Sequence, residues 1–227
     1  DRSNEDAEKE AQAEKRKLAA EKDQKEKEIK EYHDSKIKID EDEFTGTKKV
    51  TMELRDFSGH HLSDKYNDKW PYSLWVFMLV KVDKKFTLHT VLTTDNWWFV
   101  DDKNSLSIIT DSMGTISLST IRNDRNTIKS GVQEYMIYEL TKEQLMAIRD
   151  TKGVIKARFT CNNHGNSYDN FWNWPNPETV DQETIEKLDL HSYYADNSIE
   201  DIGGHTSLIT MQECIRYFLD NYGEENK

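Results

Sequence analysis

The sequence predicts a mainly β protein with added helices, of the α+β class. The expected architecture is an antiparallel β-sandwich or partly open barrel preceded by a long charged N-terminal helix. Three observations support this prediction: charge is concentrated at the start of the chain, short strands with period-two alternation follow, and a single helix is inserted among them. A parallel α/β fold would need helices between most of its strands.

Charge and length set the first limits on function. The 227 residues carry 31 Lys plus Arg against 43 Asp plus Glu, which gives a formal net charge of −12. This acid excess argues against a protein that binds nucleic acid by neutralising phosphates, so no nucleic-acid partner is expected. The longest apolar stretch, residues 74–80, is too short for a membrane-spanning helix, which needs about 20 apolar residues.

The charge also divides the chain into unlike parts. Residues 1–34 hold 12 acids and 9 bases, whereas the other 193 residues hold 31 acids and 22 bases. We therefore expect a charged helical stalk or linker at 1–35 and a β-rich domain at 36–161. Residues 162–227 are expected to form a loop and helical extension that packs on the same domain.

The sequence of the charged stalk, residues 1–35, predicts a single solvated helix. Ser3 and Asp6 suit its start, and no Gly or Pro interrupts the run to Tyr32. Acid–base pairs four residues apart each add about 0.2–0.5 kcal/mol, and the apolar residues are too few for a coiled-coil seam. A disordered charged tail is the alternative. The pairs are Glu5/Lys9, Glu21/Lys25, Asp23/Lys27 and Glu26/Lys30.

Period-two alternation of β-forming residues predicts the strands of the next domain. The dense apolar run at 74–82 is typical of a central strand, and the short link at 83–85 is typical of a hairpin. The expected strands cover residues 37–39, 50–54, 74–82, 86–92, 97–100, 106–109, 115–118, 132–140 and 154–161.

Two capping boxes predict helices later in the chain. Residues 141–144 form one in front of a short helix, and residues 210–213 form the other in front of a helix that runs to Asn221. Between these helices we expect a loop at 162–166, a rigid aromatic turn at 172–177 and a further helix at 179–190.

Three features together carry a resemblance to a known group of proteins. They are Glu43-Phe-Thr-Gly46 at the first long strand, Trp-Trp-Phe at 97–99, and the helix at 141–147 that leads to Val154-Ile-Lys-Ala-Arg158. Their order resembles that of domains of unknown function in bacterial cell-envelope lipoproteins, where a charged linker follows a lipidated N-terminus. The resemblance covers about residues 40–160. It implies a β-sandwich and an extracytoplasmic location, and it implies no activity.

The start of the chain agrees with this expected location. The chain begins at Asp1 rather than at Met, which is typical of a processed or truncated start. We expect a domain tethered to a membrane surface through a removed N-terminal lipid anchor that is absent from this chain. An arbitrary boundary is the alternative.

Patterns for metal binding and catalysis are weak. The seven His form no HExxH motif and no spaced set with Cys, so neither a metal nor another cofactor is expected. There is also no GxSxG nucleophile elbow. His164, which lies three residues after Cys161, and Asp169 mark the region that would serve a hydrolase, the alternative function.

The two cysteines leave two alternatives open. In an oxidising compartment Cys161 and Cys214 could form a disulfide that closes a loop of 53 residues. The chain-entropy model values such a bond at roughly 4 kcal/mol. In a reducing compartment both residues are expected to be buried thiols.

The aromatic residues give the strongest signal for binding. Six Trp and ten Tyr are present, several of them in polar company. Aromatic planes beside Asn and Asp suit a surface that binds a sugar or a protein. We therefore predict Trp97, Trp172 and Trp174 as candidate binding residues, with burial in the core or cover of a sheet edge as the alternative.

Together these observations favour a non-catalytic, extracytoplasmic binding domain on a charged stalk. Its expected partner is a protein or glycan at the cell envelope. Besides the hydrolase, an intracellular interaction protein carried by a mobile element is a further alternative.

Overall fold

The structure is a computed structural model that describes residues 2–54, 60–61, 74–94, 97, 99–129, 131–163, 166–175 and 211–224. For residues 2–8, 25, 53–54, 60–61, 74–76, 94, 154, 162–163, 166–175 and 211 only the backbone is described. The chain divides into two compact units, Asp1–Lys36 and Ile37–Lys227.

The first unit consists of helix α1 (Arg2–Ser35), which confirms the predicted charged helix. Its ion pairs are solvent-exposed and four residues apart, so each adds little stability. In the pairs Lys17–Glu21, Lys22–Glu26, Lys27–Glu31 and Lys30–Asp34 the base precedes the acid, the reverse of the order expected from the sequence. Neither α1 nor any other helix in the described part of the chain is both long and apolar enough to cross a membrane.

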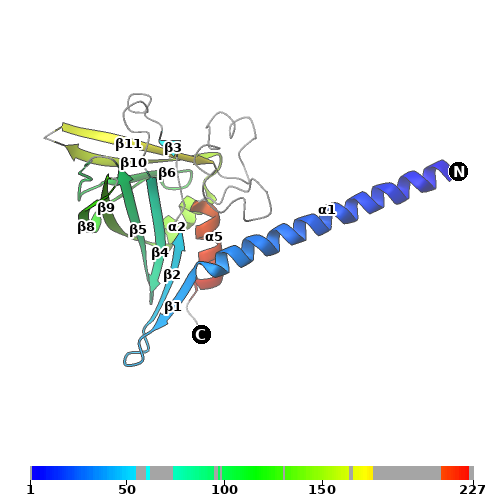
Figure 1. The fold of residues 1–227 in the computed structure, drawn as a ribbon, viewed down its shortest axis with the longest axis horizontal. Helices are drawn as coiled ribbons and strands as arrows, with labels where there is room; N and C mark the ends of the chain where they lie inside the picture. Colours follow the sequence, from blue (N-terminus) through cyan, green and yellow to red (C-terminus); the bar gives the residue numbers. More distant parts are fainter. Residues whose placement is uncertain are drawn as a thin grey trace. The chain divides into compact units, whose positions relative to one another are not determined.

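The second unit contains two open sheets whose strand pairs are all antiparallel in its described part (Figure 1), which confirms the predicted mainly β, α+β class. One sheet has the order β1 (Ile37–Glu41), β2 (Lys48–Leu54), β4 (Leu74–Val82), β5 (Lys85–Thr94), β9 (Gly131–Leu140), β8 (Thr120–Ile128). The other has the order β3 (His60–His61), β11 (Asn166–Pro175), β10 (Val154–Asn163), β6 (Leu106–Thr110), β7 (Gly114–Leu118).

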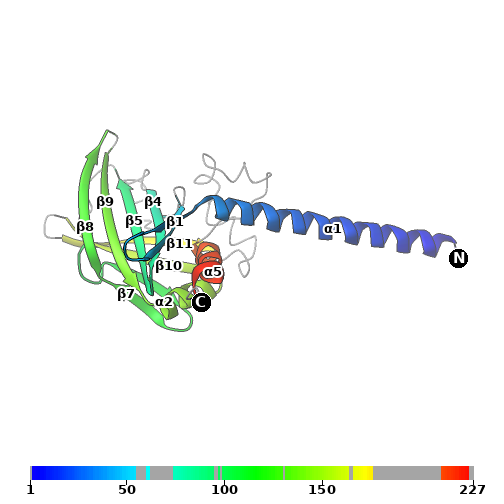
Figure 2. The same ribbon diagram turned by 90° about the horizontal axis from the view of Figure 1, so that it is seen from below.

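The core lies between the two sheets. Strands β10 and β11 run across the direction of β4 and β5 in both Figure 1 and Figure 2, which is the arrangement of crossed sheet packing. Alternate residues of each strand fill the space between the layers, since successive side chains of a strand point to opposite faces. The buried residues include Phe77, Leu79, Leu88, Leu92, Met136 and Tyr138 of the first sheet and Leu106, Ile108, Ile155 and Phe159 of the second.

Two helices pack on this core. Helix α2 (Lys142–Asp150) begins with the predicted capping box, in which Thr141 and Gln144 each bond the other's backbone N–H. Helix α5 (Met211–Tyr222) contacts α2, and its Phe218 ring lies 6.5 Å from the ring of Phe86 in β5. The predicted cap of α5 at Thr210 and the predicted helix at 179–190 lie outside the described residues.

Three predictions about strands were wrong. The described residues of the expected strand at 97–100 are not in a strand, because Phe99 has a left-handed backbone (φ 54°) and Val100 makes only an isolated bridge with Cys161. The polar strand β8 was missed, since the sequence Thr-Ile-Arg-Asn-Asp-Arg-Asn-Thr-Ile has no period-two alternation. The expected loop at 162–166 and aromatic turn at 172–177 are wrong at residues 162–163, 166 and 172–175, which pair in the β10–β11 hairpin. The other positions of the two segments lie outside the described residues.

Candidate functional site

Of the three candidate binding tryptophans, only Trp97 has a described side chain. It lies between β5 and β6, is partly buried, and its ring is 6.1 Å from that of Phe99, with the two planes inclined by 38°. Trp172 and Trp174 lie in β11, where their backbones pair with Ala157 and Ile155, both buried. Their side chains lie outside the described part of the structure. The structure therefore brings Trp97 together with Phe99.

The structure does not contain the disulfide that the sequence allowed. Cys161 in β10 and Cys214 in α5 are both buried and both free. The Cys161 thiol lies 3.8 Å from the carbonyl oxygen of Phe159, and burial raises the pKa of the Cys214 thiol well above its usual value. Both side chains therefore behave as small apolar core residues.

Of the two residues proposed for the alternative hydrolase, the structure describes only the backbone of one. His164 lies outside the described residues, and Asp169 is described only through its backbone, which pairs with Thr160. Within the described ranges, no three His, Cys, Asp or Glu side chains gather as metal ligands.

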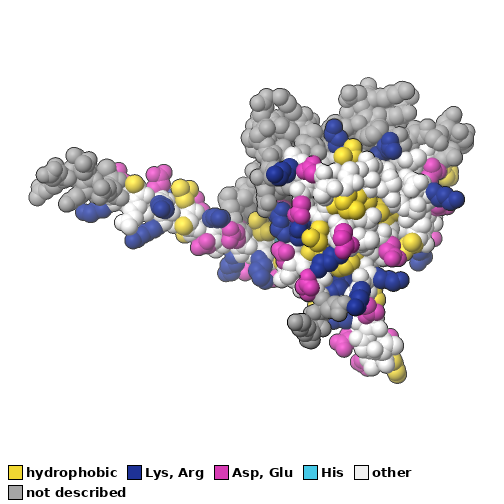
Figure 3. Space-filling view, turned by 180° about the vertical axis from the view of Figure 1, so that it is seen from behind, with side chains coloured by type: hydrophobic (Ala, Val, Ile, Leu, Met, Phe, Trp, Pro, Cys, Tyr) yellow, Lys and Arg dark blue, Asp and Glu magenta, His cyan; other side chains and the backbone are white. Residues whose placement is uncertain are grey.

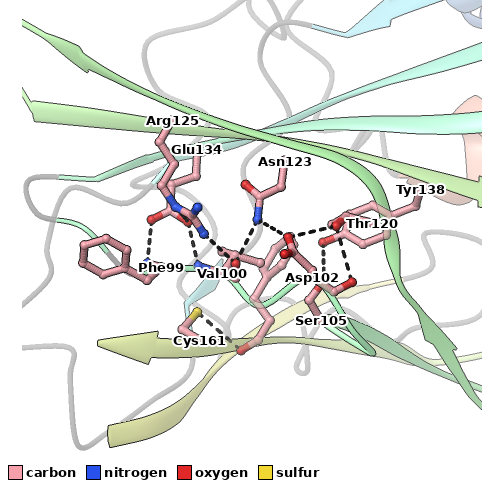
Figure 4. Close-up of polar contacts among 11 residues, drawn as sticks. Phe99, Val100, Asp102, Ser105, Thr120, Asn123, Arg125, Glu134, Tyr138 and Cys161 are labelled. Carbon is pink, nitrogen blue, oxygen red and sulfur yellow. Dashed lines mark hydrogen bonds and ion pairs between the residues drawn. The ribbon is translucent and has the colours of Figure 1, made fainter. Parts of the chain in front are cut away.

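A densely bonded polar region surrounds the described part of the link between β5 and β6. This connecting segment, residues 99–105, runs between the two sheets and is bonded to both (Figure 4). Its backbone bonds join Asp101 N to Thr160 O (3.0 Å), Thr160 N to Ser105 O (2.8 Å) and Thr120 N to Asp102 O (2.8 Å).

A buried carboxylate holds the start of the connecting segment. Glu134, in β9, is only 1% exposed. Its two oxygens accept the backbone N–H groups of Phe99 (2.6 Å) and Val100 (2.7 Å), and the Arg125 side chain of β8 lies 3.8 Å away. Bonds from N–H groups to a charged acceptor are among the strong hydrogen bonds of proteins, and they offset part of the cost of burying the charge.

Arg125 connects the same segment to the surface. One terminal nitrogen donates to the Val100 carbonyl at 2.8 Å, and the guanidinium carbon lies 5.5 Å from the centre of the Phe99 ring. The side chain is about one third exposed. The Phe99 ring therefore lies near both Trp97 and a cation, and a cation–π contact adds about 0.5–1 kcal/mol at exposed sites.

Further polar groups fix the rest of the connecting segment. The Asn123 amide donates to the Val100 carbonyl (2.9 Å) and to the Asp102 carboxylate (3.1 Å). At the other end, the fully buried Tyr138 hydroxyl lies 3.0 Å from the Ser105 hydroxyl. Burial raises the pKa of Tyr138, so its hydroxyl stays protonated and able to donate.

This arrangement suits positioning better than proton transfer. Both oxygens of Glu134 accept hydrogen bonds from backbone amides. The carboxylate therefore holds the backbone of Phe99 and Val100 in place and does not face a substrate. The bonds force Phe99 into a left-handed conformation that non-Gly residues seldom adopt, and such strain persists only where the surroundings determine it. The result is a partly exposed aromatic pair, Trp97 and Phe99, in which the backbone of Phe99 is held by the buried carboxylate.

A second polar cluster lies in the first sheet. His89 of β5 is hydrogen-bonded through Nδ1 to the Tyr135 hydroxyl (2.5 Å) and through Nε2 to the Thr87 hydroxyl (3.0 Å). Burial, with the charge of Lys49 as a second cause, lowers the pKa of His89 to about 4. Burial also raises the pKa of Tyr135. His89 is therefore neutral in the folded protein near pH 7.

We expect the folded protein to lose stability as the pH falls from about 6.5 to about 4. In that window the unfolded chain protonates His89, with a pKa near 6.5, while the folded chain does not, so acid favours unfolding. Denaturant unfolding at pH 7 and pH 4.5 measures this effect, and the His89→Gln variant should show a smaller change than wild type. A His89 NMR titration midpoint near 6.5 in the folded protein would contradict the expectation.

Glu134 forms part of no sequence motif, but the pattern of its strand marks it. Along β9 the buried positions alternate as Val132, Glu134, Met136, Tyr138 and Leu140, so an acid occupies an inward position of an apolar face. A buried acid needs a compensating partner. Period two therefore marks Glu134 as unusual, whereas nothing local to the sequence identifies Phe99 N and Val100 N as its donors.

Comparisons of the chain with models of protein families, with curated proteins and with solved structures found no match.

Proposed function

We propose that the β-rich unit is a non-catalytic recognition domain that binds a protein or glycan at the cell envelope. Trp97 and Phe99 would form part of its contact surface. The observation that carries this proposal is the bonding of the connecting segment, which holds an aromatic pair at the surface by means of the buried Glu134.

Rigid aromatic side chains are efficient contact residues. A ligand that binds them gains a large apolar contact, and the protein loses little side-chain freedom because aromatic side chains have few rotatable bonds. The nearby Arg125 adds a cation that is about one third exposed. Protein and glycan ligands both offer apolar patches beside polar groups, and both match this combination.

The extracytoplasmic location is part of the same proposal. It is supported by the charged helix α1, which suits a spacer, and by the resemblance to envelope lipoprotein domains. A secretion signal that ends in a lipidated Cys in the complete reading frame would support it. A reading frame without such a signal would favour the intracellular interaction protein.

The Trp97→Ala variant tests the binding surface. Removal of a ring that anchors a ligand should weaken binding by about tenfold or more, as is common for an aromatic hot spot. The measurement is binding of wild type and variant to an array of purified cell-envelope glycans and to an immobilised envelope protein fraction. Only a ligand that wild type binds specifically and the variant binds more weakly supports the proposal.

Met113→Ala is the matched control. Met113 lies in the turn between β6 and β7 and is 49% exposed, so its loss removes exposed apolar surface elsewhere on the domain. The control should bind like wild type, and all three proteins should melt at similar temperatures. Equal binding by the Trp97→Ala variant would place the ligand elsewhere, and no binding by wild type to either probe would remove the proposal.

A further inference from the structure

The turn between β1 and β2, residues 42–47, carries an exposed aromatic side chain. Phe44 is 99% exposed, more than any other large hydrophobic residue in the described part of the chain. Single exposed hydrophobic side chains are ordinary on protein surfaces, so exposure alone does not mark a docking residue. The position of Phe44 therefore depends on how well the turn is fixed.

The turn is fixed by its own hydrogen bonds. The Asp42 carboxylate accepts the backbone N–H groups of Phe44 (2.8 Å) and Thr45 (3.2 Å), and these bonds lower the pKa of Asp42. Gly46 adopts a left-handed backbone (φ 69°), and its N–H donates to the Asp42 carbonyl at 2.7 Å. The Asp42 N–H in turn bonds Thr47, so Phe44 stands at the tip of a closed turn.

The turn also extends beyond the sheet. The pairing of β2 with β4 ends at Lys49 opposite Val82, so residues 42–47 lie past the last rung of that strand pair. Figure 1 shows this hairpin extending below the sheet, and Figure 3 shows the same end of the molecule as a projection with acidic and hydrophobic side chains. The tip is therefore free to enter a hollow on another surface.

The charge beside Phe44 restricts the kind of surface to which the 42–47 turn can bind. Four consecutive acids, residues 40–43, directly precede Phe44. Lys49 and Lys48 stand opposite Asp40 and Glu41 in the hairpin, so the acid surplus lies at Asp42 and Glu43, beside Phe44. An acidic run of this kind is repelled by an anionic lipid surface and attracted by a basic one. The complementary site is therefore an apolar hollow with a basic rim.

The outer face of the five-stranded sheet offers such a hollow. Ile109 of β6 is 52% exposed there and stands directly opposite Lys156 of β10 in the strand register. The hollow has a volume of about 160 Å³, comparable to cavities of about 150 Å³ that hold a benzene ring. Its lining residues are Ser107, Ile109, Thr115, Lys156, Ala157 and Arg158, two basic residues and no acid.

We propose that Phe44 of one copy of this chain docks in the Ile109 hollow of a second copy. The phenyl ring fills the apolar floor, and the acids at 40–43 face Lys156 and Arg158 at the rim. The contact uses two different surfaces, so each bound copy still presents one free tip and one free hollow. Such a heterologous contact builds chains of copies instead of stopping at a symmetric dimer.

Sedimentation of the whole chain across a wide range of concentrations tests this contact. The weight-average mass of wild type should rise with concentration, and added salt should weaken the association because opposite charges face each other at the rim. Phe44→Ser and Ile109→Glu should each lower the association constant by about tenfold or more. Both residues are exposed, so the two variants should melt like wild type.

Sedimentation of a mixture of the two variants is the most specific test of the contact. Phe44→Ser keeps the hollow and Ile109→Glu keeps the tip, so the mixture should form a one-to-one dimer that neither variant forms alone. Ile121→Ser, which removes a 61% exposed residue of β8, should associate like wild type.

Three results would overturn the proposal. They are a wild-type chain that stays monomeric at every concentration, association that survives Phe44→Ser, and a mixture of the two variants that contains no dimer.

Discussion

Replacing Glu134 with Ala is expected to lower the free energy of unfolding by about 3 kcal/mol. The substitution removes a buried acceptor and leaves the N–H groups of Phe99 and Val100 without their partners. The expected loss stays near the lower end for a buried charge, because Arg125 is about one third exposed and can turn toward water. Urea unfolding of wild type and variant measures the difference.

Glu139→Ala is the matched control for this prediction. Glu139 lies in the same strand, β9, but is exposed to solvent, so its loss should change stability by less than about 0.5 kcal/mol. Glu134→Gln should fall between the two, since it keeps the shape and one acceptor oxygen. Equal stabilities of the Glu134→Ala and Glu139→Ala variants would show that the connecting segment does not depend on the buried carboxylate.

Replacing Phe218 with Ala is expected to detach α5 and to lower the free energy of unfolding by about 3–5 kcal/mol. Phe218 is 1% exposed, and its ring contacts the rings of Phe86 at 6.5 Å and Tyr222 at 5.8 Å. The substitution leaves a cavity between the helix and β5. Thermal unfolding measures the loss of stability.

The rates at which Cys161 and Cys214 react with a thiol reagent measure local opening of the structure around each residue. Cys214 is on α5 and Cys161 is in β10, and both are fully buried. In the Phe218→Ala variant a thiol reagent should modify Cys214 faster than Cys161, because α5 opens before the sheets. The exposed Asp220→Ala serves as control and should leave both rates unchanged. Equal acceleration at the two thiols would mean that the unit unfolds as a whole.

Period-two patterning and capping chemistry predicted the central part of the fold. Strands β5 and β9 show period-two alternation because one face of the sheet covers the core, whereas β4 was predicted from its dense apolar run. The capping box at Thr141 could also be predicted from the sequence, because both of its hydrogen bonds join residues three positions apart. Local rules of this kind locate elements but do not say which elements are neighbours.

The missed features depend on contacts between distant residues. Strand β8 is an edge strand paired only with β9, and it is held by this pairing and by polar side chains such as Asn123 and Arg125, so it has no apolar alternation. The conformation of Phe99 is set by Glu134, 35 residues further along the chain. Of the candidate site residues, the sequence identified Trp97 but missed Phe99, Arg125 and Glu134, which hold it in place.

Lys81 connects strand β4 to residues near the end of the chain, and this contact affects the order in which the second unit folds. Its ammonium group donates to the carbonyl oxygens of Tyr222 (2.6 Å) and Glu224 (2.8 Å), residues 141 and 143 positions further along the chain. Contacts across such separations form late, because the intervening chain must first be ordered. On the ribosome, β4 therefore emerges long before its last partner, and one end of the sheet stays uncovered until α5 has been synthesised.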